Sequence, residues 1–131
     1  MIKDNVLKAL SALGFIPEEI EEFGYRFDYE DLIVLYAIDD EETKCITLKA
    51  PNVFDITDDN RVAALEAMAK LCDKVKYVQP HIAFGNKVWL TYQHYLGDNE
   101  VTPELIEHMI RALAYSTITI HNILNGNDND D

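Results

Sequence analysis

The apolar positions near the start of the chain repeat with the spacing of an amphipathic helix. This helix would bury one stripe of side chains and end at Gly14, since glycine is a common helix stop. The stripe consists of Val6, Leu7, Leu10 and Leu13. An acidic segment at 18–22 follows, and we interpret it as a solvated connector.

From residue 24 onward the period changes to two, which is typical of β-strands. Tyr25, Phe27 and Tyr29 alternate with charged residues, so this strand would bury one face. Residues 32–38 are almost entirely apolar and predict a central strand that is covered on both faces. After a polar turn at 39–42, residues 45–49 alternate again. The three runs together predict an antiparallel meander.

A second helix is predicted beyond Pro51 and the polar residues that follow it. Thr57, Asp58 and Asp59 are candidate caps, and three lysines near the far end suit the helix dipole. We interpret one face of this helix as core because its apolar residues recur at helical spacing. These residues are Val62, Leu65, Met68, Leu71, Cys72 and Val75.

Two strand-like runs, 77–84 and 88–96, are joined by Gly85-Asn86, a pair that favours a two-residue hairpin turn. Such a turn would place Ala83 opposite Val88 and Ile82 opposite Trp89. One face of the hairpin would then carry Tyr77, His81, Ala83, Val88, Leu90 and Tyr92, and the other Val78, Ile82, Phe84 and Trp89. Both faces are apolar enough to need cover.

The second of these faces supplies the candidate contacts with a partner or with a second copy of the chain. They are Val78, Ile82, Phe84 and Trp89. Trp89 leads this set because tryptophan is enriched at the residues that dominate binding energy. Burial of Trp89 in the core of the monomer is the competing interpretation.

Thr102-Pro103-Glu104 is the clearest helix start in the chain, with a capping hydroxyl, a proline in the first turn and an acid beside it. Residues 115–124 are rich in β-branched side chains and alternate, so a sixth strand competes with a helix that runs to Leu124. The lack of a turn signal favours the helix. Residues 125–131 are polar and acidic, and they predict a disordered tail after a single domain over 1–124.

The net charge of −13, from 11 basic and 24 acidic residues, excludes a nucleic-acid partner because such a surface repels phosphate backbones. Solubility explains this charge more simply than a cationic partner does. The two cysteines show no CxxC spacing, which fits a reducing compartment. With no signal-peptide pattern and no apolar run of about 18 residues, we expect a cytoplasmic protein without membrane attachment.

The sequence shows no motif of the common phosphate-binding, metalloprotease or hydrolase classes. Four histidines are dispersed at positions 81, 94, 108 and 121, and zinc needs three or four converging ligands. The acidic clusters lack the spacing of a calcium loop. We therefore expect no catalytic residues, no metal ion and no cofactor, and we classify the chain as non-enzymatic.

The order of elements resembles the type III secretion chaperone-like fold, and in particular the YbjN-like family, small bacterial proteins described as proposed sensory-transduction regulators. The resemblance rests on the helix end Asp73-Lys74-Val75-Lys76, the hairpin around Gly85-Asn86 and the helix start Thr102-Pro103-Glu104-Leu105-Ile106. Pro80 departs from it, although an edge strand tolerates proline. The resemblance implies an α+β fold of order α-β-β-β-α-β-β-α, with an antiparallel sheet packed by helices, and a binding protein without known catalytic residues.

Two functions remain open at this point. The first is a non-enzymatic interaction module, chaperone-like or an adaptor, that binds another polypeptide through strand edges and apolar patches. The second is a regulatory domain that senses a small molecule in a pocket between the sheet and the last helix. Because three helices cover about one face of the sheet, we also expect a homodimer.

Overall fold

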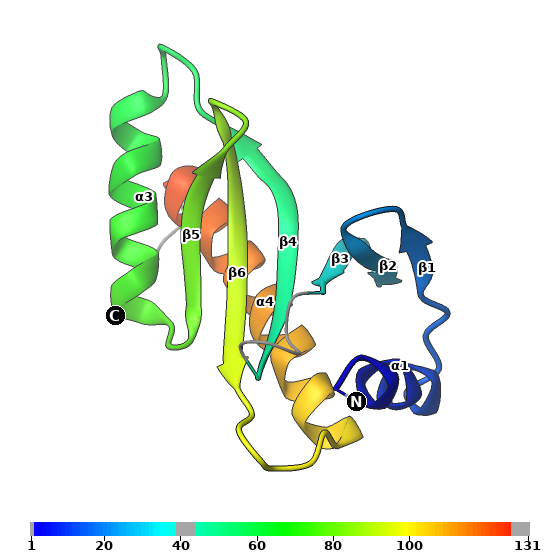
Figure 1. The fold of residues 1–131 in the computed structure, drawn as a ribbon. Helices are drawn as coiled ribbons and strands as arrows, with labels where there is room; N and C mark the ends of the chain where they lie inside the picture. The colour runs from blue at the N-terminus through cyan, green and yellow to red at the C-terminus, as the bar shows by residue number, and fades with distance from the viewer. Residues whose placement is uncertain (1, 39–43, 127–131) are drawn as a thin grey trace.

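The computed structural model describes residues 2–38 and 44–126, and this part of the chain forms the α+β fold shown in Figure 1. The predicted polar turn at 39–42 and the tail residues 127–131 lie outside the described residues. The elements follow the chain as α1 (Ile2–Ala12), β1 (Glu18–Ile20), β2 (Gly24–Tyr29), β3 (Leu32–Ala37), β4 (Cys45–Asp55), α3 (Arg61–Lys74), β5 (Val78–Ala83), β6 (Lys87–Tyr95) and α4 (Pro103–Leu124).

The described strands form one sheet in the order β1-β2-β3-β4-β6-β5, and all neighbours are antiparallel. The predicted order of helices and strands is confirmed. The structure has one further strand that the sequence did not predict. This strand, β1, lies in the segment interpreted as a connector, and its Glu19 pairs with Tyr25 of β2. Gly24 is required where β2 begins, because a Cβ at its φ of 155° would collide with the carbonyl of Tyr36.

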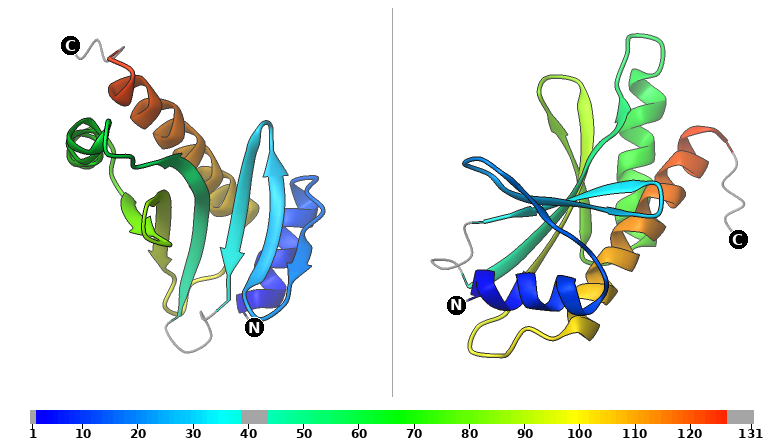
Figure 2. Two further views of the ribbon diagram at one scale, coloured as in Figure 1. Left: turned by 90° about the horizontal axis from the view of Figure 1, so that it is seen from above. Right: turned by 90° about the vertical axis from the view of Figure 1, so that its right-hand side faces the viewer.

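The helices lie on one side of β4, β5 and β6. In Figure 1 α4 runs behind these three strands and α3 stands beside the edge strand β5. Figure 2 shows α1 beside the N-terminal half of α4, at the other end of the molecule from the β5–β6 hairpin turn. Among the described residues, no helix covers the opposite side of β4, β5 and β6, which we call the open face.

The two faces of the sheet differ in composition because side chains alternate along each strand. On the helix side of β4 and β6 the buried residues are Ile46, Leu48, Ala50, Val88, Leu90 and Tyr92. The open face of the same strands carries Thr47, Lys49, Thr91 and Gln93. The buried residues on the helix side belong to the hydrophobic core. Burial of each large apolar side chain among them stabilises the fold by about 1.5–3 kcal/mol.

The last helix runs to Leu124, which confirms the helical interpretation of residues 115–124. It begins at the predicted cap, where Thr102 Oγ1 accepts a hydrogen bond of 3.1 Å from the backbone N–H of Leu105. The β-branched residues are accommodated because the hydroxyls of Thr117 and Thr119 donate to backbone carbonyls one turn earlier, at 2.9 and 2.8 Å.

The second helix buries only part of the predicted face: Leu71 is buried, and Met68 and Val75 are partly buried against the core. Its buried residues are Ala64, Ala67 and Leu71, whereas Val62 is 70% exposed and Leu65 and Cys72 are also exposed. The alanines explain the difference, because small side chains let the helix approach its neighbours closely and turn the larger apolar residues outward. The helix also begins later than predicted, after Asn60.

Pro51 does not end the third strand of the meander. β4 continues to Asp55, with an irregular register between Ala50 and Phe54. Asn52 takes a φ of 49° within this irregularity, a conformation that asparagine tolerates better than most residues. The bend lets one strand pair with both β3 and the full length of β6.

Candidate functional site

The β5–β6 hairpin has a register one residue away from the predicted one. Its loop consists of residues 84–86 rather than 85–86, so Ala83 pairs with Lys87, Ile82 with Val88 and His81 with Trp89. A shift of one residue moves side chains between faces of a sheet. The four candidate contact residues therefore do not share one face.

Val78 cannot contact a partner in this fold. It pairs with Tyr92 on the helix side of the sheet and is only 2% exposed, so its side chain belongs to the core. Ile82 lies on the same side, one pair from the hairpin loop, and is 45% exposed. The sequence predicted that both residues share a face with Trp89, and the observed register puts Trp89 on the opposite face.

Phe84 is the most exposed of the four candidates. It is the first residue of the hairpin loop, is 79% exposed and has a φ of 53°, in the left-handed region. Its ring centroid lies 5.6 Å from that of Trp89. We call this end of the hairpin, which carries Phe84 and Trp89 and, on the helix side of the sheet, Ile82, the hairpin end.

Trp89 is half-buried on the open face and is held by several contacts. Its Nε1 donates a hydrogen bond of 3.1 Å to Oδ1 of Asn52, at the irregular point of β4. Its ring centroid lies 6.4 Å from the imidazole of His81. The ring of Trp89 therefore packs against that of Phe84, and part of the Trp89 ring is exposed to solvent.

Polar contacts join the β5–β6 hairpin to the end of β4 and to the connection between β4 and α3. The backbone N–H of Ile56 donates to the carbonyl of Asn86 in the hairpin loop at 2.7 Å. Lys87 forms an ion pair of 3.0 Å with Asp55. The loop thus has a defined position relative to the β4–α3 connection.

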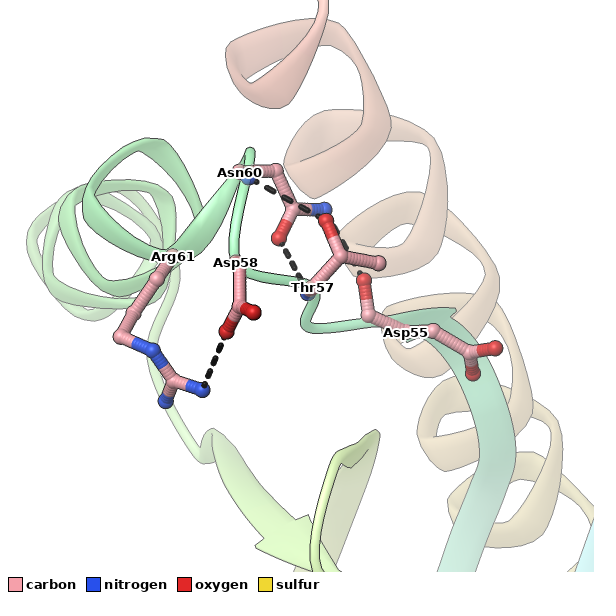
Figure 3. Close-up of polar contacts among 5 residues, drawn as sticks. All are labelled: Asp55, Thr57, Asp58, Asn60 and Arg61. Atoms are coloured by element: carbon pink, nitrogen blue, oxygen red, sulfur yellow. Dashed lines mark hydrogen bonds and ion pairs between the residues drawn. The ribbon is translucent and has the colours of Figure 1, made fainter.

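The β4–α3 connection is closed by Asn60, as Figure 3 shows. Its Oδ1 accepts from the N–H of Thr57 at 2.6 Å, and its N–H donates to Oγ1 of Thr57 at 3.2 Å. Its Nδ2 donates to the carbonyl of Asp55 at 2.9 Å. Asn60 thus satisfies backbone groups ahead of α3, but its side chain makes no hydrogen bond to the first turn of the helix, so it does not cap α3 in the way predicted for Thr57, Asp58 and Asp59.

A second feature of the open face is a shallow hollow of about 530 Å³ that is lined by both polar and apolar residues. Its walls are Phe23, Ala37, Thr47, Lys49, Gln79, Pro80, His81, Thr91 and Gln93. The side chains bind one another, since His81 and Thr91 share a hydrogen bond of 2.7 Å and Gln93 donates to Thr47 at 3.2 Å. The uncovered face is therefore polar here, and not the apolar surface that the sequence predicted.

The pKa of His81 lies below its usual value of 6.5. Burial is the larger cause, because it disfavours the charged imidazolium, and the positive charge of Lys49 adds to it. His81 is therefore neutral at pH 7. A neutral imidazole suits its hydrogen bond with Thr91 and its contact with Trp89.

Within residues 2–38 and 44–126, no group of three or more His, Cys, Asp or Glu side chains could hold a metal ion. Cys45, which is half-buried, and Cys72, which is exposed, form no disulfide. No described helix is both long enough and apolar enough to cross a membrane.

No protein-family model matches the sequence, and no curated protein matches it at a significant level. Solved structures share its fold. YbjN from E. coli, described as a proposed transcription regulator, has a TM-score of 0.68 at 13% identity, over 89% of this chain and 87% of that one. An uncharacterised protein from Methanothermobacter thermautotrophicus has a TM-score of 0.60 at 12% identity, over 96% and 98%. The chain therefore has a YbjN-like fold.

Proposed function

We propose that this protein is a non-enzymatic interaction module, chaperone-like or an adaptor, that binds another polypeptide through the hairpin end. The observation that carries the proposal is Phe84, an exposed aromatic residue in left-handed backbone. The YbjN-like fold supports a binding role only by analogy, since fold does not determine function.

Phe84 is a costly residue at its position. A left-handed φ costs an L-residue with a bulky side chain about 1–2 kcal/mol, whereas glycine or asparagine adopts it readily. Its ring is also mostly in water, so the fold recovers little of this cost by burial. Strain of this kind clusters at binding sites, where it positions a side chain for contact.

Binding by strand addition is disfavoured at both edges of the described sheet. Pro80 lies in the middle of β5 and lacks the N–H that an added strand would need. The other edge, β1, has three residues, and two of them are the exposed Glu18 and Glu19. We therefore assign recognition to side chains at the hairpin end and not to a strand edge.

We also propose that the chain forms a homodimer. The reason differs from the sequence argument, since most of the residues that line the hollow of the open face are polar, whereas Ile82 and Phe84 are exposed at the hairpin end. A second copy is then one candidate occupant of the hairpin end. Light scattering of the full chain should give twice the mass of one chain, and Phe84→Asn should shift the mass toward that of the monomer.

The test of partner binding compares two variants that each remove one exposed apolar side chain. Phe84→Asn removes the ring and keeps a residue that tolerates the left-handed φ. Ile16→Asn removes an exposed isoleucine in the segment between α1 and β1. The tagged wild-type chain and Ile16→Asn should capture the same polypeptide from cell extract, and Phe84→Asn should lose it. Equal capture by all three proteins would contradict the proposal.

A second candidate function is a regulatory domain that senses a small molecule. One observation favours it, a small basic pocket between the end of α3 and the middle of α4. This position matches the expected pocket between the sheet and the last helix only in part, because α3 forms one wall.

A further inference from the structure

A pocket of about 260 Å³ lies between the segment that follows α3 and the middle of α4. Its walls comprise Lys74, Val75, Lys76, Tyr77, His108, Ala112, Tyr115 and Ser116. We call it the lysine pocket. Its volume lies just below the range of about 300–1,000 Å³ that is typical of ligand sites, so it would enclose a small group and leave the rest of a larger ligand outside.

The charge of the lysine pocket is opposite to that of the chain. Among the described residues its walls include Lys74 and Lys76 but no aspartate or glutamate, in a protein with a net charge of −13. Lysine side chains in the walls disfavour a metal ion or another cation. An anion is the ligand that the charges favour.

Several of the residues in the walls also have side chains that can donate hydrogen bonds. Besides the two lysines they carry the hydroxyls of Tyr77, Tyr115 and Ser116 and the imidazole of His108. A phosphate group presents several acceptor oxygens and matches this set better than a carboxylate, which has two.

Ser116 supplies an independent observation. It is 1% exposed, and its hydroxyl has no hydrogen-bond partner among the described residues. The hydroxyls of Thr117 and Thr119 on the same helix donate to carbonyls one turn earlier. A buried hydroxyl without a partner is costly, and a ligand oxygen in the pocket would provide one after a small side-chain adjustment.

Tyr77 supplies a second. It is 68% exposed and has a φ of 72°, a strained conformation for a tyrosine. Its ring stacks on that of Tyr92 with centroids 5.8 Å apart, and Tyr92 in turn meets His108 edge-on at 6.1 Å. The strained residue thus stands at the rim of the pocket and is held there by a chain of rings.

We propose that the lysine pocket binds the phosphate group of a small phosphorylated metabolite. The charged lysines attract the group, the hydroxyls of the walls bind its oxygens, and the exposed rings of Tyr77 and Tyr115 flank whatever is attached to it. This inference develops the sensing function and does not depend on the hairpin end, so the two can fail separately.

The test is a calorimetric titration of the full chain at constant ionic strength with inorganic phosphate, a nucleoside monophosphate and the nucleoside without phosphate. Phosphate should bind saturably with a dissociation constant of about 1 mM or tighter. Tighter binding of the monophosphate would identify a phosphorylated ring compound as the ligand, and equal binding would identify free phosphate. Equal binding of the bare nucleoside, or no saturation by phosphate up to about 20 mM, would overturn the proposal.

Matched variants locate the site. Lys76→Gln should weaken phosphate binding roughly tenfold, by loss of one charge-assisted contact. Lys8→Gln removes the same charge from the exposed side of α1 and should leave binding unchanged. Equal weakening by both variants would show diffuse attraction instead of a pocket and would contradict the proposal. Unchanged circular dichroism of each variant verifies that both are folded.

Discussion

Strand β5 has an exposed aromatic residue in left-handed backbone just outside each of its ends. Tyr77 precedes the strand with a φ of 72°, and Phe84 follows it with a φ of 53°. Their surroundings differ, because Tyr77 lines a pocket with lysines and hydroxyl-bearing residues, whereas the ring of Phe84 contacts that of Trp89. Both ends have an aromatic residue with a positive φ, so the backbone does not distinguish them. The neighbouring side chains therefore decide what each end can bind.

The largest effect is expected inside the strand, where Val78 and Ile82 share a face but not an environment. Val78→Ala should lower the free energy of unfolding by about 2–3 kcal/mol, because it empties a buried site. Ile82→Ala should cost less than about 1 kcal/mol, because nearly half of the side chain is already in water. Urea unfolding of both variants measures the difference. Similar losses would contradict the observed register.

Trp89→Ala should lower the free energy of unfolding by about 2 kcal/mol, less than for a fully buried tryptophan, because the ring is half-buried. The loss includes the hydrogen bond to Asn52. Circular dichroism should show a folded protein, while light scattering should show weakened association. A variant that is unfolded at room temperature would assign Trp89 to the core and remove it from the hairpin end.

Phe84→Asn should raise the free energy of unfolding by about 1 kcal/mol, because asparagine relieves backbone strain and little buried area is lost. Phe84→Ala is the control, since it removes the same ring and leaves a residue that does not favour a positive φ. Thermal unfolding should rank asparagine above alanine. If the two variants are equally stable, the backbone at position 84 is not strained.

At the other end of β5 the same substitution should have a smaller effect on stability. Tyr77→Asn relieves comparable strain but loses the stacked contact with Tyr92, which is worth about 0.5–1.5 kcal/mol. The two contributions should nearly cancel in thermal unfolding. A gain as large as that of Phe84→Asn would show that the Tyr77–Tyr92 contact contributes nothing.

The smallest effect concerns pH and the middle of the strand. The pKa of His81 is lowered in the folded protein, so near pH 6 the unfolded chain binds more protons than the folded one. Stability should therefore fall as the pH decreases below the unfolded pKa of 6.5, and it should be regained above it. His81→Gln should reduce the difference in Tm between about pH 7.5 and about pH 5.5. An unchanged difference would show that other groups cause it.

The sequence predicted elements well where local chemistry determines them. Thr102 and Pro103 specify the start of α4 through one hydroxyl and one ring, and both effects act within a single helical turn. Pro80 was assigned to an edge strand because it lacks an N–H, and β5 is the edge of the described sheet. Such features depend on few neighbours and are therefore visible in sequence.

The candidate site was predicted only in part, for a reason that lies in one residue. Gly85-Asn86 indicated a two-residue turn, but Phe84 also takes a positive φ and lengthens the loop to three residues. Nothing in the chemistry of phenylalanine signals that conformation. The predicted register was therefore wrong by one residue. It put Val78 on the same face as Trp89, and it led us to expect an apolar open face.

The lysine pocket and the two buried alanines of α3 were missed because they depend on tertiary packing. Ala64 and Ala67 have less apolar surface than Val62 and Leu65, yet the close approach of α3 to its neighbours selects the smaller residues. Ser116 and Lys76 lie 40 positions apart, and no local pattern joins them. The one available signal was the cluster of lysines near the end of α3.

The length of β5 has a consequence for occupancy. Seven residue steps separate Tyr77 from Phe84, and at a rise of about 3.3 Å per residue their backbones are roughly 23 Å apart. A small molecule in the lysine pocket cannot reach that far. Two different molecules can therefore occupy the protein at once, and substitutions at positions 77 and 84 should combine additively. A departure from additivity would measure the coupling free energy between the two ends of β5.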